Sequence, residues 1–342
     1  MAGLGEIGEF GLIDRIRARQ REYDEDVVVG IGDDCAVLRR GNILEVITTD
    51  CLVEGTHFHP GWLSMGDIGF KAMAVNISDV AAMGAVPRHA VITLFIPDGT
   101  TPEDIDNLYD GIEACAAGAG VGLVGGDIVR IHGPFAVSIT LSGTCERDDL
   151  VMRSGAREGD IIVVTGTLGE AAVGMEYLAA GRGPEGPAAE YAVARFKRPV
   201  PRHVESRVIV EKLQPTAMID ISDGLIADLW HILEMSKAGV SLSGEAVPVG
   251  EGVLRWFDGD RGSALALAIR GGEDYELLFT VKEKYEDALA EVEKETGLKL
   301  TAIGRIASKK AGFVLEAEGE QTELKPGGFD HFKGLADDRK EV

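Results

Sequence analysis

The feature that most constrains this chain is an apolar, β-branched run that ends in aspartate and recurs along the sequence. It first occurs over residues 27–36, where three valines and two glycines lead to Asp33 and Asp34. β-Branched residues favour strands, and side chains alternate along an extended chain, so only one of these carboxylates need face a site. The same arrangement leads to Asp50, Asp127 and Asp220. One such segment could be a solvated loop or a helix cap, but four of them predict one cation-binding centre.

The charge balance excludes several classes of partner. The chain has 34 basic and 57 acidic residues, which gives a formal net charge of −23. This charge repels nucleic acid and anionic membranes, and an anionic substrate would have to be bridged by metal ions. The sequence has no apolar run of the ~18–20 residues that span a membrane and no basic-then-apolar leader. We therefore expect a cytoplasmic protein that binds neither nucleic acid nor membrane.

The side chains that could bind a metal are mainly oxygen donors. The four cysteines show no C-x-x-C pairing, and the seven histidines show no metal-type spacing. Carboxylates accompanied by threonine and serine hydroxyls are hard ligands, which favour magnesium or manganese over zinc. Because the acids lie in separate segments, they cannot form a one-loop calcium site. The pattern predicts several magnesium ions shared with phosphates.

A length of 342 residues predicts two domains with substantial cores. Strands and helices alternate up to about residue 145, and the following segment, 146–160, is charged and poor in apolar residues. We therefore expect an α/β (α+β) protein with two mixed domains, residues 1–146 and 147–342.

Two helices are predicted with particular force in the first domain. Ile68, Ala72, Val75 and Met83 repeat at helical spacing, and Asp79 falls in the same row. A carboxylate on an apolar face is paired, capped or a ligand, because unpaired burial costs several kcal/mol. The second helix begins after a cap at residue 101, with proline in its first turn, and runs to about residue 119. In the second domain we expect strands near 265–270 and 275–281.

Glycine-rich signatures of nucleotide binding are not convincing here. Residues 3–8 and 120–125 match G-x-G-x-x-G, but the first has no strand before it and the second leads from a helix into a strand. The sequence has no G-x-x-x-x-G-K-[ST]. Any nucleotide is therefore held without a P-loop.

The order and spacing of several motifs resemble the thiamine-monophosphate kinase family, within the superfamily of aminoimidazole ribonucleotide synthetase and selenophosphate synthetase. The motifs are Gly8-Glu9-Phe10, Gly32-Asp33-Asp34-Cys35-Ala36, Thr48-Thr49-Asp50, Gly55-Thr56-His57-Phe58, Asn76-Ile77-Ser78-Asp79, Gly125-Gly126-Asp127, Asp220-Ile221-Ser222-Asp223-Gly224 and Gly271-Gly272-Glu273-Asp274-Tyr275-Glu276-Leu277. Each is weak alone, but together they extend over nearly the whole chain.

The resemblance implies a role for each matching residue. Magnesium ligands would be Asp33, Thr48, Thr49, Asp50, Asp79, Asp127, Asp220 and Asp223. ATP contacts would be Tyr109, Gly126, Asp127, Arg153 and Ser222, and substrate contacts would be His57, Glu273 and Phe329. Within these sets, the catalytic residues would be Asp50, Asp127, Arg153 and Asp223.

The resemblance also implies an activity and an assembly. The activity is ATP-dependent, in-line phosphorylation of thiamine monophosphate to the diphosphate with several magnesium ions. The first domain would hold ATP and magnesium and pair strands across a homodimer, while the second would complete the metal and substrate sites. Two alternatives are another ATP-using member of the superfamily, such as a ring-closing synthetase, and a non-catalytic nucleotide or metal sensor. The complete set of acids argues against the sensor.

Overall fold

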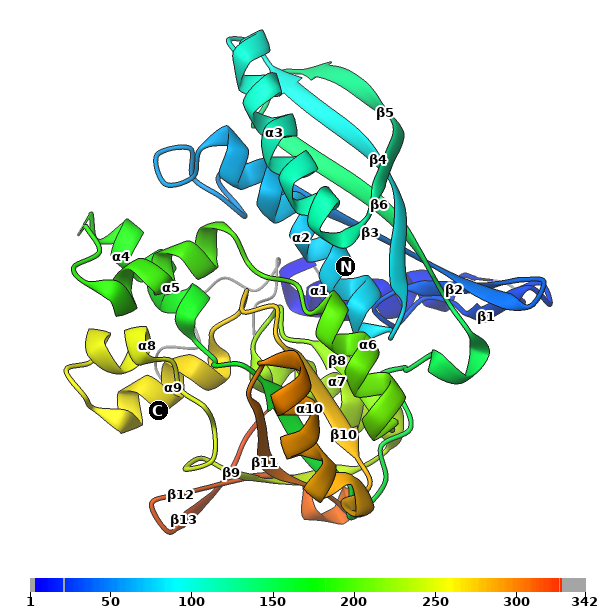
Figure 1. Ribbon diagram of the computed structural model, residues 1–342, viewed down its shortest axis with the longest axis vertical. Helices are drawn as coiled ribbons and strands as arrows, with labels where there is room; N and C mark the ends of the chain where they lie inside the picture. The colour runs from blue at the N-terminus through cyan, green and yellow to red at the C-terminus, as the bar shows by residue number, and fades with distance from the viewer. Residues whose placement is uncertain (1–3, 21, 182, 326, 328–342) are drawn as a thin grey trace.

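The computed structural model describes residues 4–20, 22–181, 183–325 and 327, and it contains two mixed sheets, one in each half of the chain (Figure 1). The two-domain, mixed α/β architecture is therefore confirmed. The boundary between residues 146 and 147 stays a prediction.

The first sheet has the strand order β1-β2-β3-β6-β4-β5. Its strands are β1 (Val27–Val29), β2 (Ala36–Arg40), β3 (Ile43–Val53), β4 (Val86–Pro97), β5 (Gly122–Ile131) and β6 (Ala136–Cys145). All neighbours are antiparallel except β4 and β5, which are parallel. The accompanying helices are α1 (Leu4–Arg17), α2 (Met65–Ala82) and α3 (Pro102–Ala119).

The second sheet has the order β13-β12-β9-β11-β7-β10-β8. Its strands are β7 (Ile161–Thr165), β8 (Ala217–Asp220), β9 (Gly239–Ser243), β10 (Leu277–Val281), β11 (Leu300–Ala307), β12 (Phe313–Ala317) and β13 (Glu320–Glu323). The helices are α4 (Glu170–Ala179), α5 (Pro187–Lys197), α6 (His203–Leu213), α7 (Leu225–Ser236), α8 (Glu251–Trp256), α9 (Arg261–Arg270) and α10 (Leu289–Thr296), and short 3-10 turns cover Arg147–Asp149, Glu283–Ala288 and Lys309–Ala311.

Helix α2 joins the two domains and brings their site residues together. One side packs on β3, β6 and α3, and the other reaches β8 and α6. A capping box between Ser64 and Asp67 fixes its start, and nearly every side chain along it is buried. A helix that is buried on most sides is hydrophobic nearly all round, so each of its few polar residues stands in apolar surroundings.

The sequence predictions succeed where local signals are strong. The predicted cap of α3 is present, with Thr101 accepting from the Asp104 amide and Pro102 in the first turn, and Asp104 completes a capping box. The predicted strand at 265–270 is wrong, because these residues belong to helix α9. Asp260 accepts hydrogen bonds from the Gly262 and Ser263 amides and so begins that helix. Its alternating alanines and larger apolar residues mimic strand periodicity, although alanine and leucine favour helix.

Candidate active site

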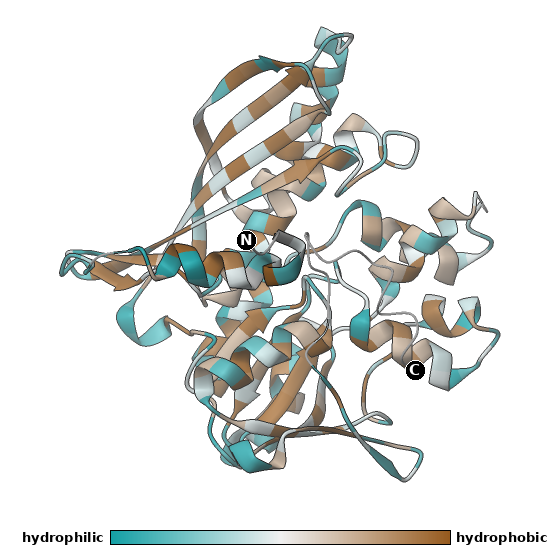
Figure 2. Cartoon of the chain, turned by 180° about the vertical axis from the view of Figure 1, so that it is seen from behind, coloured by the Kyte–Doolittle hydropathy of each residue, from teal (hydrophilic) through white to brown (hydrophobic). Residues whose placement is uncertain are grey.

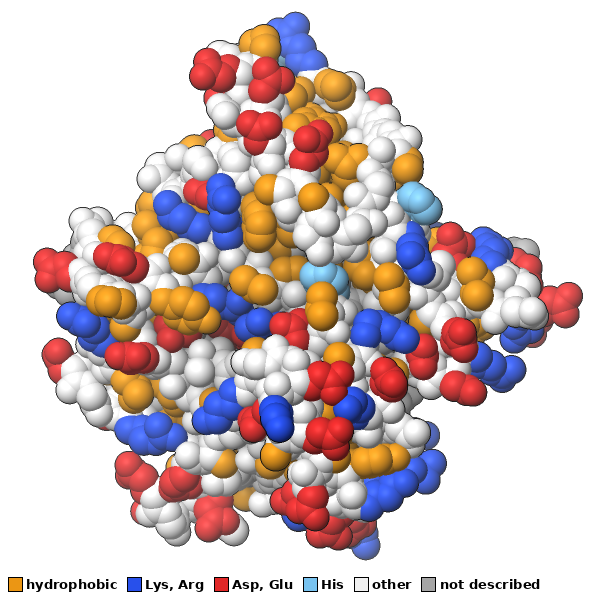
Figure 3. All heavy atoms as spheres, viewed as in Figure 1, with side chains coloured by type: hydrophobic (Ala, Val, Ile, Leu, Met, Phe, Trp, Pro, Cys, Tyr) orange, Lys and Arg blue, Asp and Glu red, His pale blue; other side chains and the backbone are white. Residues whose placement is uncertain are grey.

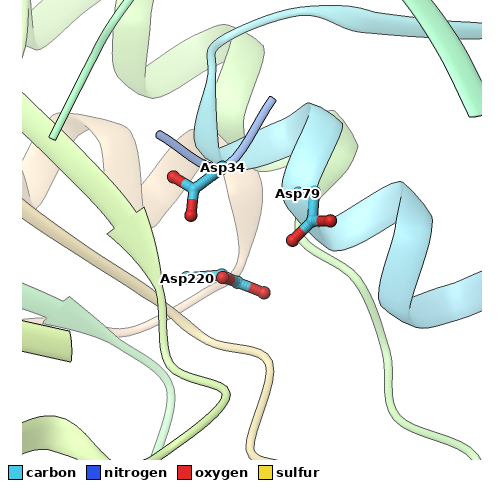
Figure 4. A group of neighbouring side chains, drawn as sticks. All are labelled: Asp34, Asp79 and Asp220. Atoms are coloured by element: carbon cyan, nitrogen blue, oxygen red, sulfur yellow. The ribbon is translucent and has the colours of Figure 1, made fainter. Parts of the chain in front are cut away.

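Three carboxylates from distant parts of the chain meet between the domains (Figure 4). Oxygens of Asp34, Asp79 and Asp220 lie within 4.8 Å of one another. Asp34 lies in the turn between β1 and β2, Asp79 near the end of α2, and Asp220 at the end of β8. These three residues are called the acidic cluster below.

Hydroxyl groups from the first domain hold the acidic cluster in place. Thr48 Oγ1 donates to Asp79 Oδ2 at 2.5 Å, and Ser78 Oγ donates to Asp220 Oδ2 at 2.6 Å. The second bond joins α2 to β8 and therefore crosses the domain boundary. The Asp50 carboxyl group interacts electrostatically with that of Asp79, so it extends the cluster along β3. Asp50 lies within this strand rather than at its end.

Burial and mutual repulsion strain the acidic cluster. Desolvation, with the neighbouring Asp34 charge, raises the pKa of Asp220 to about 7. Desolvation also raises the pKa values of Asp34, Asp50 and Asp79. Nearby carboxylates add to the shifts of Asp50 and Asp79, whereas Arg153 opposes that of Asp34. Within the described residues, the buried Asp34 Oδ2 has no hydrogen-bond partner. An unpartnered oxygen in an all-oxygen donor set fits a divalent cation of the magnesium type.

Arg153 is the cationic group beside these acids. Its Nε and Nη2 donate to Asp34 Oδ1 at 3.0 and 2.5 Å, and its backbone N–H donates to the Asp33 carboxylate at 3.2 Å. Desolvation raises the pKa of Asp33 to about 6, assisted by the adjacent Asp34 charge and opposed by Arg153. One arginine therefore contacts both acids of the Asp33-Asp34 pair.

A second loop carries two of the predicted site residues, Ser222 and Asp223. One oxygen of Asp228 accepts the backbone N–H groups of Ser222, Asp223 and Gly224, each at 3.1 Å. Asp228 is 2 % exposed and lies in the first turn of α7. It therefore fixes the loop that follows β8 directly after Asp220.

The predicted nucleotide contacts Tyr109, Gly126 and Asp127 line one cavity of about 460 Å³, together with Ile92 and Ile128. This cavity lies between α3 and β5. Gly126 permits the close approach of β4, because a Cβ atom there would lie 1.9 Å from the Ile92 carbonyl oxygen. Asp127 lies within β5, not at a strand end as expected, and does not belong to the acidic cluster.

Two other predicted site residues, Thr49 and His57, do not belong to the acidic cluster. Thr49 follows Thr48 in β3, so its side chain points to the other face of the sheet. Its hydroxyl donates to the Ile139 carbonyl oxygen at 3.2 Å and accepts from Thr140. His57 Nδ1 accepts the Val53 amide at 3.1 Å across the turn after β3.

Of the other two predicted substrate contacts, Glu273 and Phe329, the structure describes only Glu273. Glu273 lies in the segment before β10, and its Oε1 is 2.9 Å from Lys71 Nζ. Phe329 lies outside the described residues.

Four residues of the site had no functional role assigned from the sequence: Asp34, Lys71, Ser78 and Asp228. Asp34 was identified but only its neighbour was assigned as a ligand. Lys71 and Ser78 carry a readable signal, because a polar residue in an apolar helix needs a partner. Asp228 has no such signal, since an acid in the first turn of a helix is common at the surface as well.

Comparison with known proteins agrees with this architecture. Residues 32–145 match the model of the AIR synthase related protein N-terminal domain, and residues 157–315 match that of the C-terminal domain. Thiamine-monophosphate kinase of Salmonella typhimurium is 38% identical over 95% of this chain and 98% of that protein. The corresponding protein of Bacillus subtilis is 33% identical over 95% of this chain and 99% of its own length.

Solved structures show the same likeness. AaThiL complexed with AMPPCP and TMP has a TM-score of 0.84 and 31% identity, covering 97% of this chain and 99% of that chain. Thiamine-monophosphate kinase from Stenotrophomonas maltophilia K279a has a TM-score of 0.74 and 38% identity, covering 91% and 97%. The chain belongs to the thiamine-monophosphate kinase family of AIR synthase related proteins.

Proposed function

We propose that this protein transfers the γ-phosphoryl group of ATP to thiamine monophosphate, forming thiamine diphosphate. The observation that carries this proposal is the convergence of carboxylates from both domains beside Arg153. Family membership supports it, as does the related structure that contains AMPPCP and TMP together. No helix in the described part of the chain is long and apolar enough to cross a membrane.

The reaction needs charge control more than proton removal. The acceptor is a phosphate monoester with a second pKa of about 6, so it is already an oxyanion at neutral pH. Two unit charges ~4 Å apart repel by about 4 kcal/mol at an effective dielectric of 20. Phosphoryl transfer of this kind is therefore catalysed mainly by positioning and electrostatic stabilisation.

Magnesium ions would supply the positive charge between the two phosphates. We propose Asp33, Thr48, Asp50, Asp79, Asp220 and Asp223 as their ligands, and we add Asp34 because of its unpartnered buried oxygen. Thr49 and Asp127 are proposed as ligands on family membership alone, because their side chains do not belong to the acidic cluster. Thr48 and Ser78 hold two of these carboxylates in fixed orientations through their hydroxyl groups.

Arg153 would stabilise charge on the transferred phosphoryl group, since its guanidinium is already held beside the acids. The nucleotide would occupy the cavity lined by Tyr109, Gly126 and Asp127, with Ser222 contacting it from the second domain. Thiamine monophosphate would contact His57, Glu273 and Phe329. In this assignment, residues 1–146 bind ATP and magnesium and residues 147–342 complete the site.

We further propose a homodimer formed through the first sheet. β5 is an edge strand, and all of its residues are at least partly exposed. Val124 is 61% and Ile128 67% exposed, which is unusual for apolar residues of a strand. Figure 2 shows hydrophobic residues alternating with polar ones along the strands of the first sheet. Figure 3 shows apolar side chains at the surface between α3 and β5. An uncovered edge of this kind is suited to pairing with a second copy.

The test of the activity is product analysis after incubation with ATP, magnesium and thiamine monophosphate. We expect one thiamine diphosphate and one ADP per turnover. The matched control is Asp50→Asn, which should form neither product. ADP formation without thiamine diphosphate would favour another ATP-using member of the superfamily, and nucleotide binding without turnover would favour a sensor.

A further inference from the structure

Lys71 in α2 has an unusual environment for a lysine. Its side chain is fully buried, and its Nζ lies 4.0 Å from the centroid of the Phe196 ring. Among the described residues, the carboxylate that pairs with it is Glu273, at 2.9 Å. Within the described residues Nζ has no hydrogen-bond partner, so its contact with Glu273 is an ion pair. A buried ammonium needs a counter-charge, and Glu273 supplies it.

Glu273 has an equally constrained backbone. Its φ is +69°, and that of Tyr275 is +50°, a region that residues other than glycine rarely adopt. The Glu273 amide donates to the Ser222 carbonyl oxygen at 2.7 Å, and the Tyr275 amide donates to that of Ile221 at 2.9 Å. Gly272 permits this contact, because a Cβ atom there would lie 2.3 Å from the Ser222 oxygen. The segment is therefore held tightly against the loop that follows Asp220.

We propose that Lys71 is a positioning residue that orients the Glu273 carboxylate for the substrate. This rests on the proposed function, in which Glu273 contacts thiamine monophosphate. Lys71, which belongs to the first domain, holds one carboxylate oxygen of Glu273. The Glu273 side chain is 28% exposed, so part of it stays accessible to a ligand. Because the pair is neutral as a whole, Glu273 acts as an oriented acceptor more than as a bare negative charge.

The position of Lys71 also relates the substrate contact to the acidic cluster. Lys71 and Asp79 are eight residues apart in α2. At 1.5 Å per residue, this separation is about 12 Å along the helix axis. An elongated substrate with its phosphate at the carboxylates could therefore reach Glu273 with its other end. The same helix would then set both contacts.

The experiment is a double-mutant cycle with Lys71→Met and Glu273→Gln. If Lys71 acts through Glu273, each single variant should raise the KM for thiamine monophosphate about tenfold, with kcat and the KM for ATP within about twofold. The double variant should show the same KM as Glu273→Gln alone. Additive effects, or an unchanged KM in Lys71→Met, would overturn the proposal.

Thermal unfolding gives a second, independent readout. Glu273→Gln should lower Tm by several degrees, because it leaves the buried Lys71 without its counter-charge. Adding Lys71→Met should restore Tm but not the KM for thiamine monophosphate. A double variant that is no more stable than Glu273→Gln would refute the pairing, even if Lys71→Met alone cannot be purified.

The matched control is Val80→Ala, in the same helix and equally buried. It should lower Tm and leave both KM values unchanged, which separates positioning from a general loss of stability. If the wild-type protein does not phosphorylate thiamine monophosphate, the proposed function fails. The unfolding measurements would still test the Lys71–Glu273 pair in that case.

Discussion

Arg153 and Asp34 form the closest charge pair at the site, with Nη2 and Oδ1 2.5 Å apart. The Asp34 side chain is fully buried, whereas that of Arg153 is 20% exposed. Arg153 therefore compensates part of the buried negative charge and keeps one side open towards a ligand. Asp34 can act on the reaction through Arg153 as well as through a metal ion.

The first prediction compares two aspartates of this site. Asp50→Asn should reduce kcat at least 100-fold, because it removes a charge that the proposed metal set needs. Asp34→Asn should cost less and should mainly raise the KM for ATP, since asparagine retains one acceptor for Arg153. Steady-state kinetics at saturating magnesium checks this order. Equal losses in both variants would show that Asp34 is as essential as Asp50. Asp14→Asn, at an exposed aspartate, is the control and should leave the kinetics unchanged.

The second prediction concerns metal removal. The side chains that meet in the acidic cluster are carboxylates held by hydroxyl groups, and such oxygen donors favour hard cations. EDTA should abolish turnover, magnesium or manganese should restore it, and zinc should not. Isothermal titration of the metal-free protein with magnesium alone provides a readout that does not depend on activity. Full turnover in chelator would contradict the model.

The third prediction is a pH dependence of stability in the metal-free protein. The pKa values of Asp33 and Asp220 are raised to about 6 and about 7 in the folded state. Between pH 4 and 7 the folded state therefore keeps protons that the unfolded state has released, so the free energy of unfolding falls as pH rises. Tm in EDTA should be several degrees lower at pH 8 than at pH 5, and magnesium should recover it.

A matched variant isolates this effect from other titrating groups. Asp220→Asn resembles the protonated acid, so it should gain stability relative to the wild type as pH rises from 5 to 8 in EDTA. A stability difference that is independent of pH would show that Asp220 titrates normally.

The local signals in the sequence were sufficient for most elements of the first domain. The capped helix α3 and the apolar face of α2 depend on residues close in sequence, and both are present. The wrong prediction of a strand at 265–270 is a misreading of local signals, because the cap of α9 and its helix-favouring residues are close in sequence. Strands β9 and β12 are different, since their form depends on neighbours far along the chain: β9 pairs with β11 and with β12. Propensity alone does not resolve such cases.

The acidic residues of the site could be named from the sequence, but their arrangement could not. Asp79 was expected to need a partner, and Thr48 is that partner. The hydrogen bond between Ser78 and Asp220 joins residues 142 positions apart, and nothing local indicates it. The same is true of Lys71 and Glu273, whose pairing depends on how the two domains pack.

The fourth prediction tests the proposed dimer. Ile128→Lys places a charge on the exposed edge strand β5, at a residue that is 67% exposed and also lines the proposed nucleotide cavity, so the readout is mass and not activity. If β5 pairs with a second copy, light scattering should give twice 36.4 kDa for the wild type and a lower mass for the variant. Val204→Lys, on a similarly exposed apolar residue of α6, is the control and should leave the mass unchanged. A wild-type monomer at micromolar concentration would contradict the dimer.

The last prediction concerns Asp228, which is neither a member of the acidic cluster nor among the residues that line the proposed nucleotide cavity. Its one oxygen accepts three backbone N–H groups of the loop that carries Ser222 and Asp223. Asp228→Ala would leave these buried donors without a partner, at a cost of about 1–3 kcal/mol for each group that stays dry. Asp228→Asn keeps an acceptor oxygen and should retain most of the stability. We therefore expect Asp228→Ala to lower kcat about 100-fold and to raise the magnesium concentration at half-maximal activity, while Asp228→Asn changes both by less than tenfold. Loss of kcat to the same extent in both variants would show that the charge of Asp228, and not its hydrogen bonds, supports the reaction.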